Sequence, residues 1–207
     1  YKVGLYSSPH LYDYTERIKI NKKNISKKDF IHIYNFIEKK ILDYEKMSGK
    51  TFSFFEVLTA MSFIYFKKNK VDINVIETGI GGTYDTTNVI KSDIQVITPI
   101  SYDHQNVLGD TIKSISENKA GIIKENSTVI TSKQISEALE IIRKKSAEKK
   151  SKLIELNYSI KSKLSIKDFR MNTLIEINGN EYKISSNSVG RHYICLLYTS
   201  DAADELT

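Results

Sequence analysis

The chain has 207 residues, of which 40% are hydrophobic and 27% are charged, with a formal net charge of +6 and a single cysteine, Cys195. This composition supports a packed core and argues against global disorder, while one cysteine excludes an internal disulfide framework and a multi-thiolate metal site. No apolar run approaches the roughly 18–20 residues that span a bilayer, so we expect a cytoplasmic protein that has no membrane contact.

The positive charge does not by itself identify a partner. Lysines are scattered, with short runs at 22–23, at 67–68 and between 144 and 150. Nucleic-acid-binding proteins concentrate basic residues on one face, and no recognition motif of that kind is present. We therefore interpret the charge as solvated surface, with an anionic small molecule as the alternative partner, and we expect no nucleic-acid partner.

Strand and helix patterns alternate along most of the chain. "KVGLYSS" near the amino terminus predicts a short buried strand, and apolar residues at helical spacing predict helices from Ser26 to about Lys46 and from Ser53 to about Lys68. Further predicted elements are the strands "VDINVIE", "SDIQVITPI", "STVIT" and "SKLIEL", and the helices between Asp110 and Ile123 and over residues 136–150. Continuous apolar strands are typical of parallel sheets that are buried on both faces. The alternation predicts an α/β fold, with a mostly parallel sheet flanked by helices.

The hydrophobic pattern of the sequence changes between residues 172 and 184. Apolar and polar residues alternate with a period of two around Asn178-Gly179, and an Asn-Gly pair between alternating runs is a strong hairpin signal. We expect a β-hairpin near the carboxyl terminus.

Three polar residues stand at the ends of predicted strands. Ser7 follows the first strand, Glu77 follows "VDINVI", and His104 follows "SDIQVITPI". Ligands of open α/β sheets bind beyond the carboxyl ends of the strands, and a hydroxyl, a carboxylate and an imidazole suit Mg²⁺ or Mn²⁺. Alternatively, Glu77 only caps the turn that follows it and His104 is an ordinary loop histidine. The spacing alone leaves both interpretations open.

A glycine-rich loop, "GIGG" at residues 79–82, follows Glu77 directly. Glycines in such a loop indicate either a tight turn or a place where the backbone closely approaches an anion or an aromatic ring. The loop is not a Walker motif, because the pattern G-x-x-x-x-G-K-[ST] occurs nowhere in the chain.

Taken together, these motifs resemble a known family. "FFEVLTAMSFIYF", "VIETGIGGTYDTTNVI" and "VITPISYDHQNVLGDTIKSISENKAGIIK" occur in this order, and the opening "YKVGLYSSPHLYDYTERIKIN" precedes them. The set strongly resembles the folylpolyglutamate synthase and dihydrofolate synthase family of Mur-type ATP-dependent amide ligases. The similarity runs from residue 1 to about residue 135, with weaker agreement up to "GRH" at Gly190–His192.

The resemblance implies a set of metal ligands. Ser7, Glu77 and His104 match the magnesium ligands of the family, and Lys119 in "ENKAG" matches a catalytic lysine that becomes carboxylated and helps to hold a second Mg²⁺. Without carboxylation, Lys119 would repel the metal ions, so the modification reverses its electrostatic role. Without the resemblance, the sequence would indicate that Lys119 is a surface lysine on a short helix.

The resemblance also implies a substrate pocket. Its residues are Ser53, Phe54, Phe55 and Glu56, which match a stretch that lines the pterin or folate pocket, and Asp85, which matches an acid able to accept hydrogen bonds from pterin N–H groups. Aromatic faces can pack on a flat heterocycle. The same stretch also reads as a helix start with core phenylalanines, and both interpretations can hold at once.

For a full-length relative, the resemblance implies a reaction with ATP. ATP phosphorylates a carboxylate of dihydropteroate or of a folate, and the amine of L-glutamate attacks the acyl phosphate, which releases phosphate and leaves an amide. Two Mg²⁺ ions and a phosphate-loop lysine neutralise the transferring phosphoryl group. The alternatives are a Mur ligase of peptidoglycan synthesis and a non-catalytic binding protein.

The resemblance also suggests how the chain is organised. Residues 1–195 match part of the Mur-ligase-type ATP- and folate-binding domain, whereas the family's phosphate loop, which would supply the remaining ATP-binding residues, would lie before Tyr1. The family's carboxyl-terminal domain is not matched either, so we expect that this chain alone does not catalyse ligation. We also expect the protein to be a monomer. Residues 196–207 contain three acidic residues and no basic one, and they resemble a translated adaptor sequence. We expect this tail to be non-native.

Overall fold

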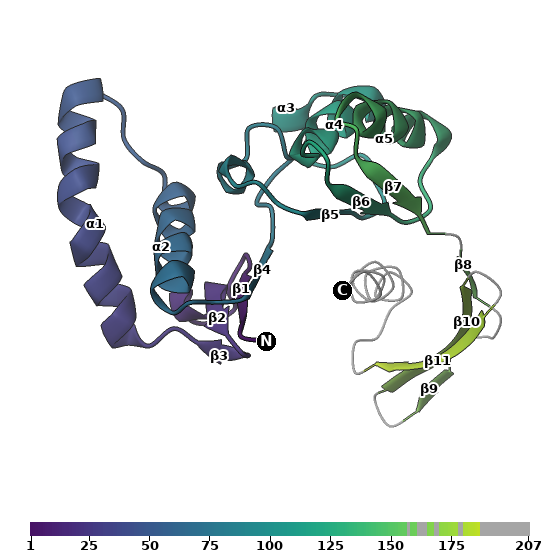
Figure 1. Ribbon diagram of the computed structural model, residues 1–207, viewed down its shortest axis with the longest axis horizontal. Helices are drawn as coiled ribbons and strands as arrows, with labels where there is room; N and C mark the ends of the chain where they lie inside the picture. Colours follow the sequence, from purple (N-terminus) through teal and green to yellow (C-terminus); the bar gives the residue numbers. More distant parts are fainter. Residues whose placement is uncertain (157, 161–164, 168–169, 178–179, 187–207) are drawn as a thin grey trace. The chain divides into compact units, whose positions relative to one another are not determined.

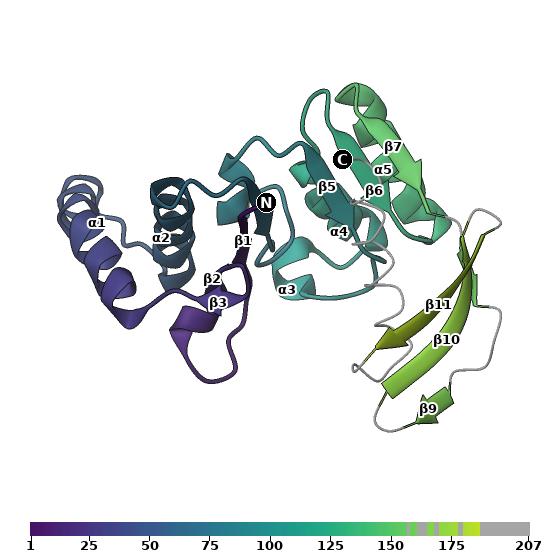
Figure 2. The ribbon, with the colours of Figure 1, turned by 60° about the horizontal axis from the view of Figure 1, so that its bottom comes forward.

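The computed structural model describes residues 1–156, 158–160, 165–167, 170–177 and 180–186. The chain divides into two compact units, which are described separately below (Figures 1 and 2). Unit 1 comprises residues 1–80 and 84–90, and unit 2 comprises residues 81–83 and 91–207. Each unit has a hydrophobic core of its own.

Unit 1 is built on a four-stranded mixed sheet with the order β3-β2-β1-β4. Strand β1 (Val3–Tyr6) pairs in parallel with β4 (Ile73–Ile76) and antiparallel with β2 (Ile18–Ile20), which in turn pairs with β3 (Lys23–Asn24). The register aligns Tyr6 with Ile76, so that β1 and β4 end at the same edge of the sheet. The other elements of unit 1 are η1 (Tyr14–Arg17), α1 (Lys27–Ser48), α2 (Phe54–Lys68) and η2 (Thr86–Val89).

The two long helices of unit 1 begin where the sequence predicts. The Ser26 side chain accepts the N–H of Asp29 at the start of α1, and Gly49 ends this helix in the left-handed conformation. The two helices lie side by side (Figures 1 and 2) and share one core with the sheet. Its buried members are Tyr6, Ile18, Ile25, Ile33, Ile37, Leu58, Met61 and Phe66.

Unit 2 contains a three-stranded, fully parallel sheet with the order β5-β6-β7. Its strands are β5 (Ile94–Ile97), β6 (Thr128–Thr131) and β7 (Lys152–Glu155). Its helices are α3 (Gln105–Leu108), α4 (Ile112–Lys119), η3 (Ala120–Ile122) and α5 (Ser136–Glu148). Helices α4 and α5 cover one face of this sheet (Figure 1) and contribute Ile112, Ile115, Ala138 and Ile142 to the core.

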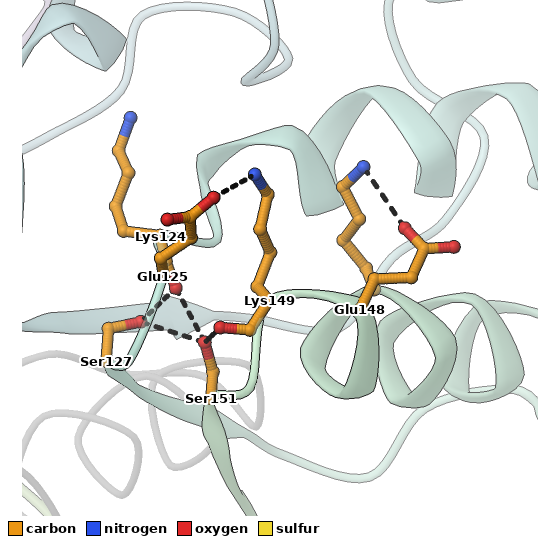
Figure 3. Close-up of polar contacts among 7 residues, drawn as sticks. Lys124, Glu125, Ser127, Glu148, Lys149 and Ser151 are labelled. Carbon is orange, nitrogen blue, oxygen red and sulfur yellow. Dashed lines mark hydrogen bonds and ion pairs between the residues drawn. The ribbon is translucent and has the colours of Figure 1, made fainter.

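A polar network ties the amino ends of β6 and β7 together. The Ser151 hydroxyl donates to the Lys124 carbonyl at 2.6 Å, and Ser127 Oγ lies 2.8 Å from the same carbonyl and 3.3 Å from Ser151 Oγ (Figure 3). Burial lowers the pKa of Lys124, and the charge of Lys149, which itself pairs with Glu125, lowers it further. Ligands of parallel sheets bind beyond the opposite, carboxyl ends of the strands. We therefore interpret this network as part of the fold.

The last described strands form an antiparallel sheet. They are β8 (Tyr158–Ile160), β9 (Ser165–Lys167), β10 (Arg170–Ile177) and β11 (Asn180–Ser186). Strands β10 and β11 pair along their length, with Ile177 opposite Asn180, which confirms the predicted hairpin. Its turn residues, Asn178 and Gly179, lie outside the described residues, as do Cys195, the "GRH" motif and the tail at 196–207.

The predicted α/β class is confirmed, but one strand differs from its expected environment. The sequence predicts that β4 is buried on both faces, whereas Ile73 and Val75 are exposed in unit 1. The reason is that Ile73 and Val75 lie on the same face of the strand and neither belongs to the core of unit 1, whereas Ile76, on the opposite face, packs against that core. In the described part of the chain, no helix has the length and hydropathy needed to cross a bilayer.

Two isoleucines on α1 provide a test of this packing. Ile33 is 2% exposed, whereas Ile31 is 59% exposed. We expect Ile33→Ala to lower the free energy of unfolding by about 2–4 kcal/mol, because it removes buried methyl groups and leaves a cavity. Ile31→Ala should change it by no more than about 0.5 kcal/mol. Denaturant unfolding followed by circular dichroism measures both, and equal effects would contradict the assigned core.

Candidate functional site

Parallel pairing of β1 and β4 places Ser7 next to Glu77. The Glu77 N–H donates to the Tyr6 carbonyl at 2.9 Å, which extends the pairing one residue beyond the strands. The Glu77 carboxylate then accepts the N–H of Ser8 through Oε2 at 2.8 Å. A hydroxyl-bearing residue and a carboxylate therefore share one edge of the sheet. Their role as metal ligands stays a prediction.

His104 and Lys119 belong to unit 2. His104 precedes α3 in the left-handed conformation, with φ 49° and ψ 38°, and its half-exposed imidazole places Nε2 3.5 Å from Asp103 Oδ2. A non-glycine residue in this conformation costs on the order of 1 kcal/mol, and such strain is frequent at functional sites. Lys119 is the half-buried last residue of α4. The metal-binding role predicted for both residues is not tested by these contacts.

Among the described residues, no group of three or more histidine, cysteine, aspartate and glutamate side chains is placed to hold a metal ion. The predicted ligand set contains only two residues of those types, Glu77 and His104, together with a serine and a lysine. A hydroxyl, a carboxylate, an imidazole and a carboxylated lysine would offer mainly oxygen donors. That donor chemistry fits a hard ion such as Mg²⁺.

The first glycine of the loop makes a tight turn beneath an aromatic ring. A Cβ atom on Gly79 would lie 2.7 Å from Phe55 Cζ, so any other residue here would force the Phe55 ring to shift. Asp85 Oδ2 accepts the N–H groups of Gly79 at 3.0 Å and Ile80 at 2.9 Å, while Oδ1 accepts the N–H and the hydroxyl of Thr87. Both carboxylate oxygens of Asp85 therefore close the loop and cap η2. Its predicted contact with a pterin would share oxygens that already accept these bonds.

The remaining loop glycines face the end of α4. A Cβ atom on Gly82 would lie 2.8 Å from the carbonyl oxygens of both Asn118 and Lys119, and Gly81 has φ +72°. The Thr83 N–H donates to the Asn118 carbonyl at 2.9 Å. The close backbone approach indicated by the sequence is thus an approach to the chain's own helix, the one that carries Lys119.

The predicted pocket stretch divides into two kinds of residue. Ser53 and Glu56 form the capping box of α2, and the Glu56 carboxylate accepts the Ser53 N–H at 2.7 Å. This hydrogen bond, followed by that of the Ser53 hydroxyl, lowers the pKa of Glu56. Phe55 packs against Tyr6 with ring centroids 5.8 Å apart, whereas Phe54 is 51% exposed. Phe54 is therefore the more exposed of the two phenylalanines in the stretch.

Phe54 belongs to a cluster that sequence reasoning missed. The Arg17 guanidinium lies 5.5 Å from the centroid of the Phe54 ring, and its Nε donates to His10 Nδ1 at 2.9 Å. The Tyr14 ring contacts the rings of both His10 and Phe54, at centroid distances of 4.7 and 5.3 Å. We call these four residues the arginine–aromatic cluster. The segment "PHLYDYTER" was the available signal, but its contact with Phe54 arises only in the folded chain.

Two carboxylates hold the loop that carries this cluster. Glu16 accepts the N–H groups of Leu11, Tyr12 and Asp13 at 3.0, 2.9 and 2.8 Å. Asp13 caps η1 by accepting the N–H and the hydroxyl of Thr15. The Thr15 N–H is the largest cause that lowers the pKa of Asp13, from 3.8 to about 2.

The Asp13 cap predicts a specific pH dependence. A carboxyl group with a lowered pKa stabilises the fold above its unfolded value of 3.8, and this stabilisation is lost as the pH falls through about 2. The melting temperature of the wild-type chain should therefore fall more steeply than that of Asp13→Asn between these two pH values. Thermal unfolding at a series of pH values measures this difference, and parallel curves would contradict the cap.

Gly82 offers a test of the loop packing. Gly82→Ala should destabilise unit 2 by about 1–3 kcal/mol, because its methyl group would meet two fixed carbonyl oxygens. Gly49→Ala in unit 1 is the control, since it meets no atom within 4 Å and costs only the left-handed backbone, about 1 kcal/mol. Hydrogen exchange at the Thr83 amide should quicken only in the Gly82 variant. Unchanged exchange there would exclude the described packing.

No family model matches the chain, but curated proteins and solved structures do. The dihydrofolate synthase/folylpolyglutamate synthase of Bacillus subtilis is 39% identical over 144 residues, which is 69% of this chain and 34% of that protein. A solved FPGS–AMPPCP–folate complex matches with a TM-score of 0.88 at 29% identity and covers 97% of this chain and 50% of its own. The folylpolyglutamate synthase of Thermotoga maritima matches with a TM-score of 0.83 at 33% identity, covering 98% and 48%.

The chain thus spans about a third of the length of the curated relatives that it matches and about half of the solved ones. Sequence identity and backbone similarity point to the same group of proteins. The chain belongs, as a partial-length member, to the folylpolyglutamate synthase/dihydrofolate synthase family.

Proposed function

We propose that this chain is part of an ATP-dependent ligase that adds L-glutamate to dihydropteroate, to folates or to both, through an acyl phosphate. The observation that carries the proposal is the match, over 97% of this chain, to an FPGS that is solved with AMPPCP and folate. AMPPCP is an analogue of ATP, so that relative binds both classes of substrate. The name of the Bacillus subtilis relative gives two activities, dihydrofolate synthase and folylpolyglutamate synthase, which supports a bifunctional enzyme.

Ser7, Glu77, His104 and Lys119 are proposed to hold Mg²⁺. Bound Mg²⁺ would supply neutralising charge for the transferring phosphoryl group. Glu77 is oriented by the Ser8 N–H through Oε2, and no hydrogen bond from the described residues reaches Oε1. Glu77 can therefore present one oxygen to a cation while the other keeps the carboxylate in place. Ser7, Glu77 and His104 would hold the metal ions and would not act as acid–base catalysts, and Lys119, once carboxylated, would be the catalytic lysine that helps to hold the second ion.

The proposed pterin or folate pocket uses Ser53, Phe54, Phe55, Glu56 and Asp85. Phe54 is half exposed, and Phe55 packs on Gly79 in the glycine loop. Ser53 and Glu56 fix the start of the helix that bears both rings. We further propose that the protein acts as a monomer in the cytoplasm, where ATP is available.

Phe54 provides the test of this pocket on the chain itself. We expect folate and pteroate to bind, and Phe54→Ala to weaken both by about fivefold, because stacking on an aromatic ring contributes on the order of 1 kcal/mol. Phe36→Ala removes a ring of similar exposure, 61%, on α1 and should leave binding unchanged. Isothermal titration calorimetry measures the affinities. Tighter binding of a UDP-muramoyl peptide than of pteroate would favour the Mur ligase instead.

The ligase reaction itself needs a separate assay. The complete gene product that carries this chain should transfer labelled L-glutamate to dihydropteroate or tetrahydrofolate only when ATP and Mg²⁺ are present. Glu77→Gln should abolish most of this transfer while leaving folate binding unchanged. Transfer that does not need ATP would reject the proposed reaction.

A further inference from the structure

The arginine–aromatic cluster lies next to the edge where β1 ends. The Arg17 carbonyl accepts the Ser7 N–H at 3.0 Å, so the residue that carries the guanidinium is hydrogen-bonded to the residue that follows β1. Phe54, at the start of α2, supplies one wall of the cluster, and Tyr14 in η1 supplies another. The cluster therefore combines a fixed positive charge with two aromatic rings.

Arg17 has no acidic partner among the residues that the structure describes. Its Nε donates to a histidine nitrogen, and its guanidinium carbon lies 5.5 Å from the centroid of the Phe54 ring. The guanidinium carries five N–H donors, and its two terminal nitrogens match the two oxygens of a carboxylate. An arginine with a purely structural role would normally donate these N–H groups to an aspartate or a glutamate. The cluster instead leaves the terminal nitrogens available to a ligand.

The rings of the cluster are open to solvent in spite of their size. Tyr14 is 52% exposed and Phe54 is 51% exposed, and the two rings meet edge to face. Half-exposed rings beside an arginine suit a flat ligand that carries an anionic group, because the ring of the ligand can pack on the aromatic faces while its charge meets the guanidinium.

The loop is held in place before any ligand arrives. Three backbone N–H groups donate to Glu16, which immediately precedes Arg17, and Asp13 caps the same short helix. A side chain that is held in its binding position loses less entropy when a ligand binds. Such fixation of an exposed loop is typical of a binding site.

We propose that Arg17, together with Tyr14 and Phe54, binds the carboxylate of an aromatic acid. This inference rests on the proposed function, in which the substrate is pteroate or a folate. Pteroate carries a benzoate, and folate carries a benzoyl group that is linked to glutamate. Both therefore place a carboxylate at or near an aromatic ring, and the guanidinium of Arg17 binds that carboxylate.

The experiment compares three ligands on the 207-residue chain: pteroate, folate and 6-methylpterin, which has no carboxylate. We expect Arg17→Gln to weaken pteroate, folate or both by about tenfold or more, the effect of losing a charge-assisted hydrogen bond. Binding of 6-methylpterin should stay within about twofold. Arg17→Lys should restore only part of the loss, because lysine keeps the charge but not the planar fork.

The matched control is Lys40→Gln. Lys40 lies 5.8 Å over the ring of Phe36 on α1, so the variant removes the same charge and the same kind of contact elsewhere in unit 1. It should leave all three affinities unchanged. Circular dichroism and thermal unfolding of each variant show that the fold is retained.

The outcomes separate this inference from the proposed function. Loss of pteroate binding alone assigns Arg17 to the benzoate, and loss of folate binding alone assigns it to the glutamyl group. If the wild-type chain binds the ligands and Arg17→Gln leaves them unchanged, or weakens 6-methylpterin equally, the inference is overturned while the proposed function stands. If the wild-type chain binds none of the three, the inference is overturned, and the proposed function is decided by the transfer assay on the complete gene product.

Discussion

The parallel pairing of β1 with β4 is the constraint on which the candidate site depends. Because Tyr6 stands opposite Ile76, the residues that follow each strand emerge at one edge, and the Ser8 N–H fixes the Glu77 carboxylate there. A shift of one residue in this register would turn the side chains of β4 to the opposite face and remove the pair. The core of unit 1 holds the register, since Tyr6 is fully buried and its hydroxyl meets that of Thr59 at 3.1 Å.

The contacts of the glycine loop explain its role in the fold and are compatible with the proposed site. Gly79 passes under Phe55, and Gly82 passes against the backbone at the end of α4, so packing within the chain explains both glycines. Asp85 closes the loop with its two oxygens. The same contacts would fix the neighbours of the proposed flat substrate. Packing and binding are therefore complementary explanations of these residues.

Local sequence patterns predicted most of the helices and strands, whereas contacts between residues far apart in the sequence were harder to predict. Caps at Ser26 and Ser53 and the Asn-Gly pair marked element boundaries, because they act through neighbours in the sequence. The exposure of Ile73 and Val75 was not predictable, since an apolar run looks the same whether one or both faces of its strand are covered. For the candidate site, the adjacency of Ser7 and Glu77 follows from strand ends, but the contact of Arg17 with Phe54 depends on how η1 packs on α2.

The central claim is that the edge formed by Ser7 and Glu77 is a cation site of a folate-type ligase. Anomalous diffraction from crystals grown with Mn²⁺ would test it most directly. The account predicts a manganese peak at about 2.1 Å from a Glu77 carboxylate oxygen, a distance typical of Mg²⁺-type coordination, with the Ser7 hydroxyl as a further ligand. A manganese ion that binds elsewhere, while the Glu77 carboxylate accepts only the Ser8 N–H, would contradict it.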